Sequence, residues 1–365
     1  MKIECILEKL NIPVQTVVRS THKSGTLPSL QGIFLEAKQN KLSITATNLD
    51  IGVRFVIPVK VAIEGEVLVQ GDIFSKVISS IQHNEKNITL EVVGDTLVIK
   101  TEKSSIVVKT LQKEDFPPLP KIEGNTIDIQ KSVLIEGLRT VSFAAANTDI
   151  KPEIASVYIY SEPGALVFVS TDSFRLAEKK IKVKHISDLH ILIPNKNVQE
   201  IIRLCEHIED TIRLTYSDTM LTIEDSTVYI TARVVDGQFP DYKRIIPTEA
   251  LIEAKILKQD VQNSLKLSTV FSDMFNQLHI SVQQELQQIE FKTKNQNIGS
   301  VEQKIAAVIT GGDIEINLNY KYIQEVLSVI VKESIQMTFT TSNKPVVLRQ
   351  NSDDSFLYLI MPLNR

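Results

Sequence analysis

The chain has 365 residues, a formal net charge of −4 and a pI near 6.0. This length exceeds one ordinary hydrophobic core and favours two or three domains. The slight acidity excludes a protein that grips nucleic acid with an all-over basic surface, because such binding depends on many phosphate contacts. Two cysteines, Cys5 and Cys205, cannot staple a chain of this length, and no apolar stretch approaches the ~20 residues of a membrane helix. We therefore expect a cytoplasmic location and no membrane contact.

Taken in chain order, the predicted elements repeat three times. Each copy begins with an amphipathic helix, continues with a strand pair and a second helix, and ends with a hairpin and a further strand. Three landmarks recur at an interval of about 124 residues. They are the strand at 42–47, 166–171 and 289–293, the helix around Phe74, Val198 and Tyr322, and the hairpin that starts at Ile88, Ile212 and Ile335.

The residue patterns within each copy predict the type of each element. Residues 88–92 alternate apolar and polar side chains before a turn at Gly94, as a half-buried strand does. The segments 74–82, 198–205 and 320–331 instead place apolar residues three and four apart, which predicts helices with one buried face.

Proline-bearing segments close the first two copies, at Phe116–Pro120 and at Phe239–Tyr242, because proline cannot continue a central strand. We therefore predict three similar domains at residues 1–121, 122–247 and 248–365. Each is expected to be a sheet with two helices, so the fold class is α+β.

Patterns that mark an enzyme are missing from the sequence. It contains no glycine-rich phosphate loop, no zinc-protease motif and no nucleophile elbow. The cysteines fit small core residues, and His185 and His190 form at best a weak metal site. Asp50 and Asp172 fall in separate copies and are expected to form turns. The sequence predicts no catalysis, cofactor or metal, and a hydrolase that uses Asp172 and Arg175 is only a distant alternative.

Each predicted helix carries two basic residues at a spacing that returns them to nearly the same face. The pairs are Lys9 and Arg19, Lys76 and Lys86, Lys131 and Arg139, Lys196 and Arg203, Lys258 and Lys266, and Lys321 and Lys332. Pro13 is expected to interrupt the first of these helices. Any polar helix face holds basic residues, so this pattern selects no function unless the helices share one surface.

Several motifs resemble one known family. They are Thr26-Leu27-Pro28, Thr171–Leu176 (TDSFRL), Val235–Tyr242 (VDGQFPDY) and Met361-Pro362-Leu363. Together they resemble the bacterial DNA polymerase III beta subunit, the sliding clamp, from end to end and in register with all three copies. The resemblance implies a ring-shaped head-to-tail homodimer of the DNA clamp fold, a processivity factor with helices around duplex DNA. A closed ring holds DNA by topology, so an acidic chain needs little affinity.

The resemblance also implies partners. Duplex DNA would be contacted independently of sequence, and the expected protein partners are the DNA polymerase III alpha subunit, the clamp loader, and other polymerases and repair proteins with short linear motifs. The expected DNA-facing residues are Lys23, Lys76, Lys131, Arg139, Lys151, Lys196, Arg203, Lys258, Lys266, Lys321 and Lys332, with the loop at 147–151. The remaining alternative is a three-domain adaptor that never acts on DNA.

The family's client-peptide groove lies between its second and third domains. The matching positions are Ile154, Thr171, Ser173, Phe174, Arg175, Leu176, Pro240, Arg244, Ile245, Phe275, Asn319, Tyr322, Pro345, Met361, Pro362 and Leu363. Ile106 and Val108, on a predicted edge strand, and Val270 and Phe271 match the dimer interface. Asn364 and Ser156 depart from the family pattern, and the neighbours of Phe275 do so too.

Overall fold

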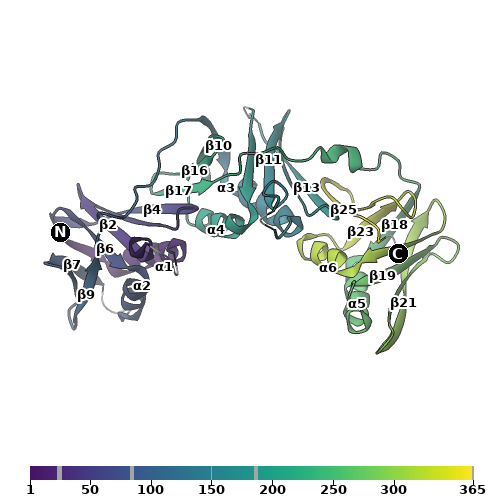
Figure 1. The fold of residues 1–365 in the computed structure, drawn as a ribbon, viewed down its shortest axis with the longest axis horizontal. Helices are drawn as coiled ribbons and strands as arrows, with labels where there is room; N and C mark the ends of the chain where they lie inside the picture. The colour runs from purple at the N-terminus through teal and green to yellow at the C-terminus, as the bar shows by residue number, and fades with distance from the viewer. Residues whose placement is uncertain (23–26, 83–85, 149, 185–187, 364–365) are drawn as a thin grey trace. The chain divides into compact units, whose positions relative to one another are not determined.

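The computed structural model describes residues 1–22, 27–82, 86–148, 150–184 and 188–363 (Figure 1). The chain divides into two compact units. Unit 1 comprises residues 1–134 and 199–234, and unit 2 comprises residues 135–198 and 235–365. Each unit contains one antiparallel sheet with its helices, so the predicted α+β class is confirmed. The expected residues Lys23, Asp149 and Asn364 lie outside the described part of the chain.

Six α-helices occur in the described residues, two for each copy of the repeat. They are α1 Leu7–Val17, α2 Gly71–Ser80, α3 Lys131–Val141, α4 Asn195–Cys205, α5 Lys258–Ser268 and α6 Tyr320–Val329. A 3-10 turn follows the first helix of each copy, at η1 Val18–Ser20, η3 Ser142–Ala144 and η5 Thr269–Phe271, and two more are η2 Pro28–Gln31 and η4 Tyr242–Ile245. In α6, Ile323, Val326 and Leu327 form the buried stripe that their spacing predicted.

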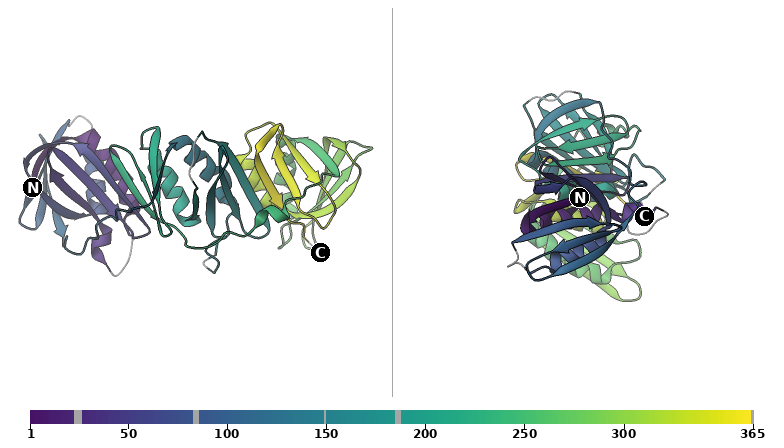
Figure 2. Two further views of the ribbon diagram at one scale, coloured as in Figure 1. Left: turned by 90° about the horizontal axis from the view of Figure 1, so that it is seen from above. Right: turned by 90° about the vertical axis from the view of Figure 1, so that its left-hand side faces the viewer.

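Unit 1 contains a sheet of thirteen strands, seen from further directions in Figure 2. In spatial order they are β10 Asn125–Gln130, β15 Thr211–Tyr216, β16 Met220–Glu224, β17 Val228–Arg233, β4 Ile51–Pro58, β3 Lys41–Thr47, β2 Gly32–Lys38, β6 Gly65–Gln70, β9 Ser105–Leu111, β8 Thr96–Lys100, β7 Asn87–Val93, β1 Lys2–Ile6 and β5 Lys60–Ile63.

Unit 2 contains a sheet of twelve strands. In spatial order they are β14 His190–Pro194, β11 Ser156–Glu162, β12 Ala165–Thr171, β13 Arg175–Lys182, β25 Asp353–Ile360, β24 Val346–Gln350, β23 Ser334–Phe339, β18 Ile252–Leu257, β21 Gly299–Thr310, β20 Gln288–Asn295, β19 Gln277–Gln283 and β22 Ile314–Asn319.

The strand pairing confirms the threefold repeat. Each copy builds two antiparallel groups of four strands. The first group is β6-β2-β3-β4, β14-β11-β12-β13 or β22-β19-β20-β21, and the second is β1-β7-β8-β9, β10-β15-β16-β17 or β18-β23-β24-β25. Within each unit the groups of neighbouring copies join edge to edge, as β4 with β17 and as β13 with β25. Two units therefore arise from three copies, and the predicted boundaries at 121 and 247 stay predictions.

One backbone contact also repeats in all three copies. The N–H at the start of the first helix donates to the carbonyl just before the hairpin strand, from Leu7 to Lys86 (3.0 Å), Lys131 to Asp210 (2.8 Å) and Lys258 to Glu333 (2.8 Å). The helix start is thus tied to the sheet, which satisfies one of its orphan donors.

The ends of three helices differ from the prediction. The expected interruption at Pro13 is wrong, because α1 continues to Val17 with Pro13 buried inside it. Lys86 and Lys332 were placed on helices, but α2 ends at Ser80 and α6 at Val329. Each of these two helices is followed by a buried isoleucine in extended conformation, Ile81 or Ile330, so the chain turns toward the core there and the helix stops.

Candidate functional site

The loop between β12 and β13 holds the TDSFRL motif in a tight turn in unit 2. The carboxylate of Asp172 accepts the N–H groups of Phe174 (2.9 Å) and Arg175 (3.0 Å), which confirms its predicted role as a turn residue. The Thr171 hydroxyl donates to the Arg175 carbonyl (2.6 Å) and accepts the N–H of Ser173, whose φ is +78°. This turn leaves the Phe174 side chain 60% exposed.

Arg175 joins this loop to two helical segments of unit 2. Its guanidinium donates to Asp172 (2.9 Å), to Glu325 on α6 (2.5 Å) and to the carbonyl of Phe143 (2.8 Å). It also lies 4.7 Å from the centre of the Tyr322 ring, within cation–π range. Burial would lower the pKa of this guanidinium, but the hydrogen bond with Glu325 and nearby acidic groups raise it. Three of its N–H groups are therefore committed within the chain.

The C-terminal residues run beside the same loop. The N–H of Met361 donates to the Phe174 carbonyl (2.8 Å), and the N–H of Leu363 donates to Asn317 on β22 (2.8 Å). Asn319 caps α6 by accepting the N–H of Lys321 (3.0 Å). Met361, Pro362, Leu363 and Tyr322 are all partly exposed.

The expected groove residues include an exposed class and a buried class, with others between them. Phe174, Ile245, Phe275, Pro240, Arg244 and Ser173 are exposed, whereas Thr171, Leu176 and Pro345 are buried; Ile154, like Asn319, is intermediate. Leu176 retains only 1% exposure because it packs against Leu359, Val347 and Tyr242 in the core. Leu176, expected to line a pocket, is therefore a core residue here, and Phe174, Ile245 and Phe275 provide exposed apolar surface.

The VDGQFPDY segment anchors the connector between the second and third copies. Phe239 and Tyr242 are buried, and Phe239 stacks on Tyr158 with ring centres 5.1 Å apart. The Tyr242 hydroxyl bonds to Tyr160 (2.8 Å) and donates to buried Glu178. Burial and the charge of Glu178 raise the pKa of Tyr242.

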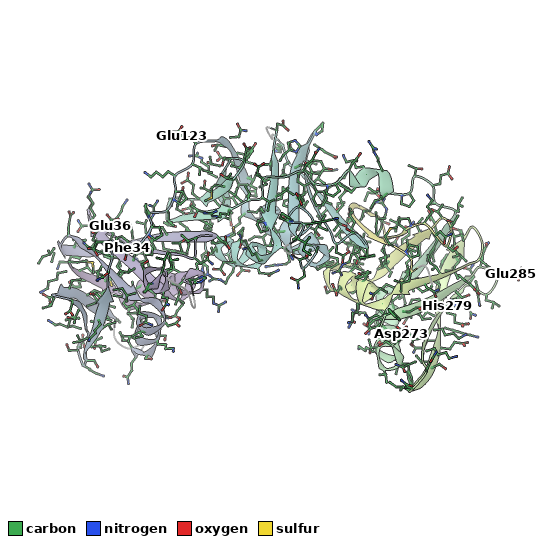
Figure 3. The ribbon with its side chains drawn as sticks, in the orientation of Figure 1. Phe34, Glu36, Glu123, Asp273, His279 and Glu285 are labelled. Carbon is green, nitrogen blue, oxygen red and sulfur yellow. The ribbon has the colours of Figure 1, made fainter. Side chains whose placement is uncertain are left out.

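The connector between the first and second copies is held by a similar stacked aromatic pair, which was not predicted from the sequence. Phe116 stacks on Phe34 of β2, with ring centres 5.2 Å apart. Figure 3 labels Phe34 and its strand neighbour Glu36. Phe34 and Tyr158 are about 124 residues apart, so the repeat interval could have identified both pairs.

Three of the expected DNA-facing residues are engaged inside the protein. The ammonium of Lys131 donates to the Ile208 carbonyl (2.6 Å), and that of Lys258 donates to the Ile330 carbonyl (2.6 Å). Arg203 pairs with Glu200 and donates to the Thr16 carbonyl (2.8 Å). These cations satisfy carbonyls near helix ends, which the spacing of basic residues could not reveal.

The other expected DNA-facing residues are accessible. Lys76, Arg139, Lys196, Lys266 and Lys321 are exposed on their helices, and Lys151 and Lys332 are exposed outside helices. Five of these seven exposed cations therefore lie on helices.

Among the residues that the structure describes, β9 and β21 are each paired on both sides over one part of their length and on one side over the rest. Residues 105–109 of β9 pair with β8, and only Thr110 and Leu111 reach β6, so the predicted edge strand is open over its first half. Residues 299–306 of β21 likewise pair only with β20.

The four expected interface residues lie on or near these edges. Ile106 and Phe271 are partly exposed and Val270 is 58% exposed. Val108 is only 6% exposed because its side chain faces the core of unit 1, and its neighbour Val107 (61%) is the accessible apolar side chain. Val107 and Val108 differ in this way because successive strand residues face opposite sides, and the assignment of Ile106 and Val108 to the dimer interface stays a prediction.

The described residues contain no group of three or more metal-ligating side chains. His190 instead contacts Asp188 (2.8 Å) and Tyr158 (2.7 Å), and His185 lies outside the described residues. Cys5 and Cys205 are buried free thiols, and burial raises the pKa of each to about 12. No described helix has the length and apolar character needed to span a bilayer.

Three family models match consecutive parts of the chain. They are described as the N-terminal, central and C-terminal domains of the DNA polymerase III beta subunit, and they match residues 1–120, 128–241 and 243–364. The matches occur in the order of the three copies.

Full-length relatives and solved structures show the same similarity. The beta sliding clamp of Bacillus subtilis is 26% identical, covering 100% of this chain and 99% of the relative, and that of Synechococcus elongatus is 24% identical with the same coverage. The crystal structure of the Thermotoga maritima DNA polymerase III beta subunit aligns with a TM-score of 0.92 at 25% identity, covering 100% of this chain and 99% of that one. The Bacillus subtilis sliding clamp structure aligns with a TM-score of 0.94 at 24% identity and the same coverage.

Proposed function

Since this chain belongs to the DNA polymerase III beta subunit family, we propose that it is a sliding clamp, a processivity factor that encircles duplex DNA and tethers the replicative polymerase. The clamp itself performs no catalysis in this proposal. Its partners are duplex DNA, a second copy of the chain, the polymerase III alpha subunit, the clamp loader, and further polymerases and repair proteins. Their common location is the cytoplasm.

The proposed ring is supported by the strand pairing that joins neighbouring copies along the sheets. At both junctions within the chain, an edge strand of a first group pairs with an edge strand of a second group. The two strands are the ones written last in the spatial orders given above, β4 with β17 and β13 with β25. By the same rule β21 of the third copy and β9 of the first copy remain to be joined, and these are the two strands with an open half. A second chain placed head to tail supplies both missing partners and closes a ring.

The rule also predicts the register of the intermolecular pairing. Ile51 faces Ala232 and Arg175 faces Ile360 in the two internal junctions. The equivalent residues are Ser300 on β21 and Val108 on β9, so antiparallel pairing would bring Val301 opposite Val107 and Glu302 opposite Ile106. Pairing would also cover two edges that would otherwise invite aggregation.

The ring explains how a chain of net charge −4 stays on a polyanion. Closure around the duplex replaces affinity, and the exposed helix cations Lys76, Arg139, Lys196, Lys266 and Lys321 need only weak, sequence-independent phosphate contacts. Weak contacts leave the ring free to slide.

Client peptides would dock on the surface formed by the 171–176 loop, the C-terminal residues and the connector near Ile245. Phe174 and Ile245 offer exposed apolar contacts, and Met361 offers an adaptable wall. An extended peptide with apolar anchors fits this chemistry.

Retention on DNA of two topologies tests the proposal. The full-length protein is loaded by its clamp loader onto nicked circular DNA and separated from free protein by gel filtration, and half of the sample is then linearised with a restriction enzyme. A dimer of about 82 kDa that stays on the circle and leaves the linear DNA is the expected result. Equal retention on both DNAs, or no retention on the circle, would refute the ring and favour an adaptor.

A further inference from the structure

A cavity of unit 1 is lined by none of the groove, DNA-facing or interface residues described above. It has a volume of about 640 Å³ and lies between the sheet and the connector that joins the first and second copies. Phe34, Glu36 and Arg54 line it from strands β2 and β4, and Phe116 and Leu119 line it from the connector. Phe34 and Glu36, labelled in Figure 3, are two residues apart and therefore lie on one face of β2.

The repeat shows what occupies the equivalent place in the second copy. Strand pairing puts Glu36 at the position of Tyr160 and Arg54 at that of Glu178. Leu119 stands at the position of Tyr242, since each lies three residues after the phenylalanine that stacks on the sheet. Three residues that line the cavity are therefore the counterparts of two tyrosines and a glutamate.

In the second copy these counterparts fill the space themselves. The Tyr242 hydroxyl bonds to Tyr160 (2.8 Å) and donates to buried Glu178. Tyr160 also continues the aromatic stack, with its ring centre 5.0 Å from that of Tyr158. The same network cannot form in the first copy, because a leucine cannot donate and an arginine cannot accept. The arginine instead requires an acceptor from outside the network.

The Arg54 guanidinium is available to such an acceptor. It is half-buried, lies 5.0 Å from the centre of the Tyr229 ring, and makes no hydrogen bond or ion pair with any described residue. The Tyr229 hydroxyl donates to the Pro120 carbonyl (2.8 Å), which holds this ring against the connector. Lys113 and Glu66, also at the cavity, pair with each other (2.7 Å). A partly desolvated guanidinium without a partner favours a carboxylate, which can accept two parallel hydrogen bonds.

We propose that the cavity binds a segment of a partner protein with an aromatic and an acidic side chain two residues apart. Such side chains point to the same side of an extended segment. The ring extends the stack of Phe116 on Phe34, as Tyr160 extends its counterpart, and the carboxylate accepts from Arg54. Glu36 is exposed, so solvent screens its charge.

A polypeptide is favoured over a small free acid for two reasons. The cavity is larger than a single side chain, and its counterpart in the second copy already holds a tyrosine carried by a chain segment. This docking surface is additional to the client groove and does not depend on ring closure.

Two short peptides and one substitution test the charge requirement. The probe acetyl-Tyr-Ala-Glu-Ala-amide is titrated into the full-length protein and followed by saturation-transfer NMR, with acetyl-Tyr-Ala-Gln-Ala-amide as its neutral match. The glutamine peptide should bind wild-type protein at least fivefold more weakly, and Arg54→Gln should weaken the glutamate peptide by a similar factor. Arg349→Gln, at a half-buried arginine of β24 in unit 2, is the matched control and should bind as wild type does.

Two further variants separate binding from folding. Arg54→Glu should prefer acetyl-Tyr-Ala-Lys-Ala-amide over the glutamate peptide, an inversion that a misfolded chain cannot produce. The triple variant Glu36→Tyr, Arg54→Glu and Leu119→Tyr rebuilds the arrangement of the second copy and should abolish binding of the glutamate peptide. Thermal unfolding checks each variant. Equal binding of the glutamate and glutamine peptides, or no binding of the glutamate peptide at millimolar concentration, would overturn the inference. Binding of 4-hydroxyphenylacetate as tight as that of the peptide would overturn the polypeptide and assign the cavity to a free aromatic acid.

Discussion

The guanidinium of Arg175 lies over the ring of Tyr322 at 4.7 Å, although the two residues belong to different copies of the repeat. The same guanidinium pairs with Asp172 and Glu325 and keeps only 10% of its side chain exposed. Arg175 is therefore a residue that fixes the position of the 171–176 loop against α6. Three of its N–H groups hydrogen-bond within the chain, while the Phe174 side chain stays exposed.

Replacing Arg175 should primarily affect stability. Arg175→Ala leaves Asp172 and Glu325 without their shared partner and is expected to lower the free energy of unfolding by about 3 kcal/mol. Chemical denaturation measures this change. Arg175→Lys is the conservative comparison: it keeps the charge but loses the forked geometry, so it should recover only part of the loss. Full recovery by lysine would show that charge alone is required.

The two classes of groove residue should separate client binding from folding. Phe174→Ala and Ile245→Ala remove exposed apolar contacts, and together they are expected to weaken a client peptide at least tenfold while the melting temperature changes little. Leu176→Ala should instead cost about 2–5 kcal/mol of stability, because the side chain is buried. Fluorescence anisotropy with a labelled peptide and thermal unfolding provide the two readouts. A peptide affinity that does not respond to the Phe174 and Ile245 changes would move the groove elsewhere.

Helix cations should likewise divide into structural and DNA-contacting residues. Arg203→Ala removes the partner of Glu200 and a donor to Thr16, and we expect a stability loss of about 2 kcal/mol. Lys321→Ala should leave stability nearly unchanged but reduce the slope of DNA affinity against salt concentration by about one. Titrations on circular DNA at several salt concentrations test the second effect. A salt slope unchanged by Lys321→Ala would mean that this side chain faces away from DNA.

The predicted strand register can be locked chemically. Val107→Cys with Val301→Cys places two thiols directly opposite each other between subunits, at a separation suited to a disulfide. Mild oxidation should convert the dimer to a covalent species on a non-reducing gel. Val107→Cys with Glu302→Cys, displaced by one residue, points the second thiol to the other face and should not cross-link. Efficient linkage of the displaced pair would show that the register is shifted.

Acid should weaken the ion pair between Glu162 and Lys243, a residue of the connector between the second and third copies, and so lower the stability of the chain. The hydrogen bond from Lys243 lowers the pKa of Glu162, with help from Lys180, so the folded chain binds this proton less readily than the unfolded chain. The associated stability is present above pH ~4.5 and is lost as the pH falls through the lowered pKa. Glu162→Gln should therefore destabilise the chain by about 0.5 kcal/mol at pH 7 and by less near pH 3. Thermal unfolding at both pH values measures the difference, with Glu315→Gln as an exposed control; an equal effect at both pH values would exclude this ion pair as the cause.

Much of the fold follows from local sequence patterns. The interval of about 124 residues predicted three copies, and alternation and helical spacing predicted β7, β15 and β23 and the helices α2, α4 and α6. The end of each helix was harder to predict, since Ile81 and Ile330 continue the apolar pattern but turn toward the core. The patterns also could not show that copies share continuous sheets, because β4–β17 and β13–β25 pairing joins strands far apart in the chain.

By itself, the sequence determined the repeat, the element types, the family resemblance and the absence of a catalytic motif, because these depend on residue identity and spacing along the chain. The tertiary structure alone decided which side chains are available. It assigned Arg203, Lys131 and Lys258 to helix-end carbonyls, Leu176 to the core and Val107 rather than Val108 to the surface. The physical reason is that a charged or apolar side chain acts according to its neighbours in space, and those neighbours come from strands and helices that sequence spacing does not bring together.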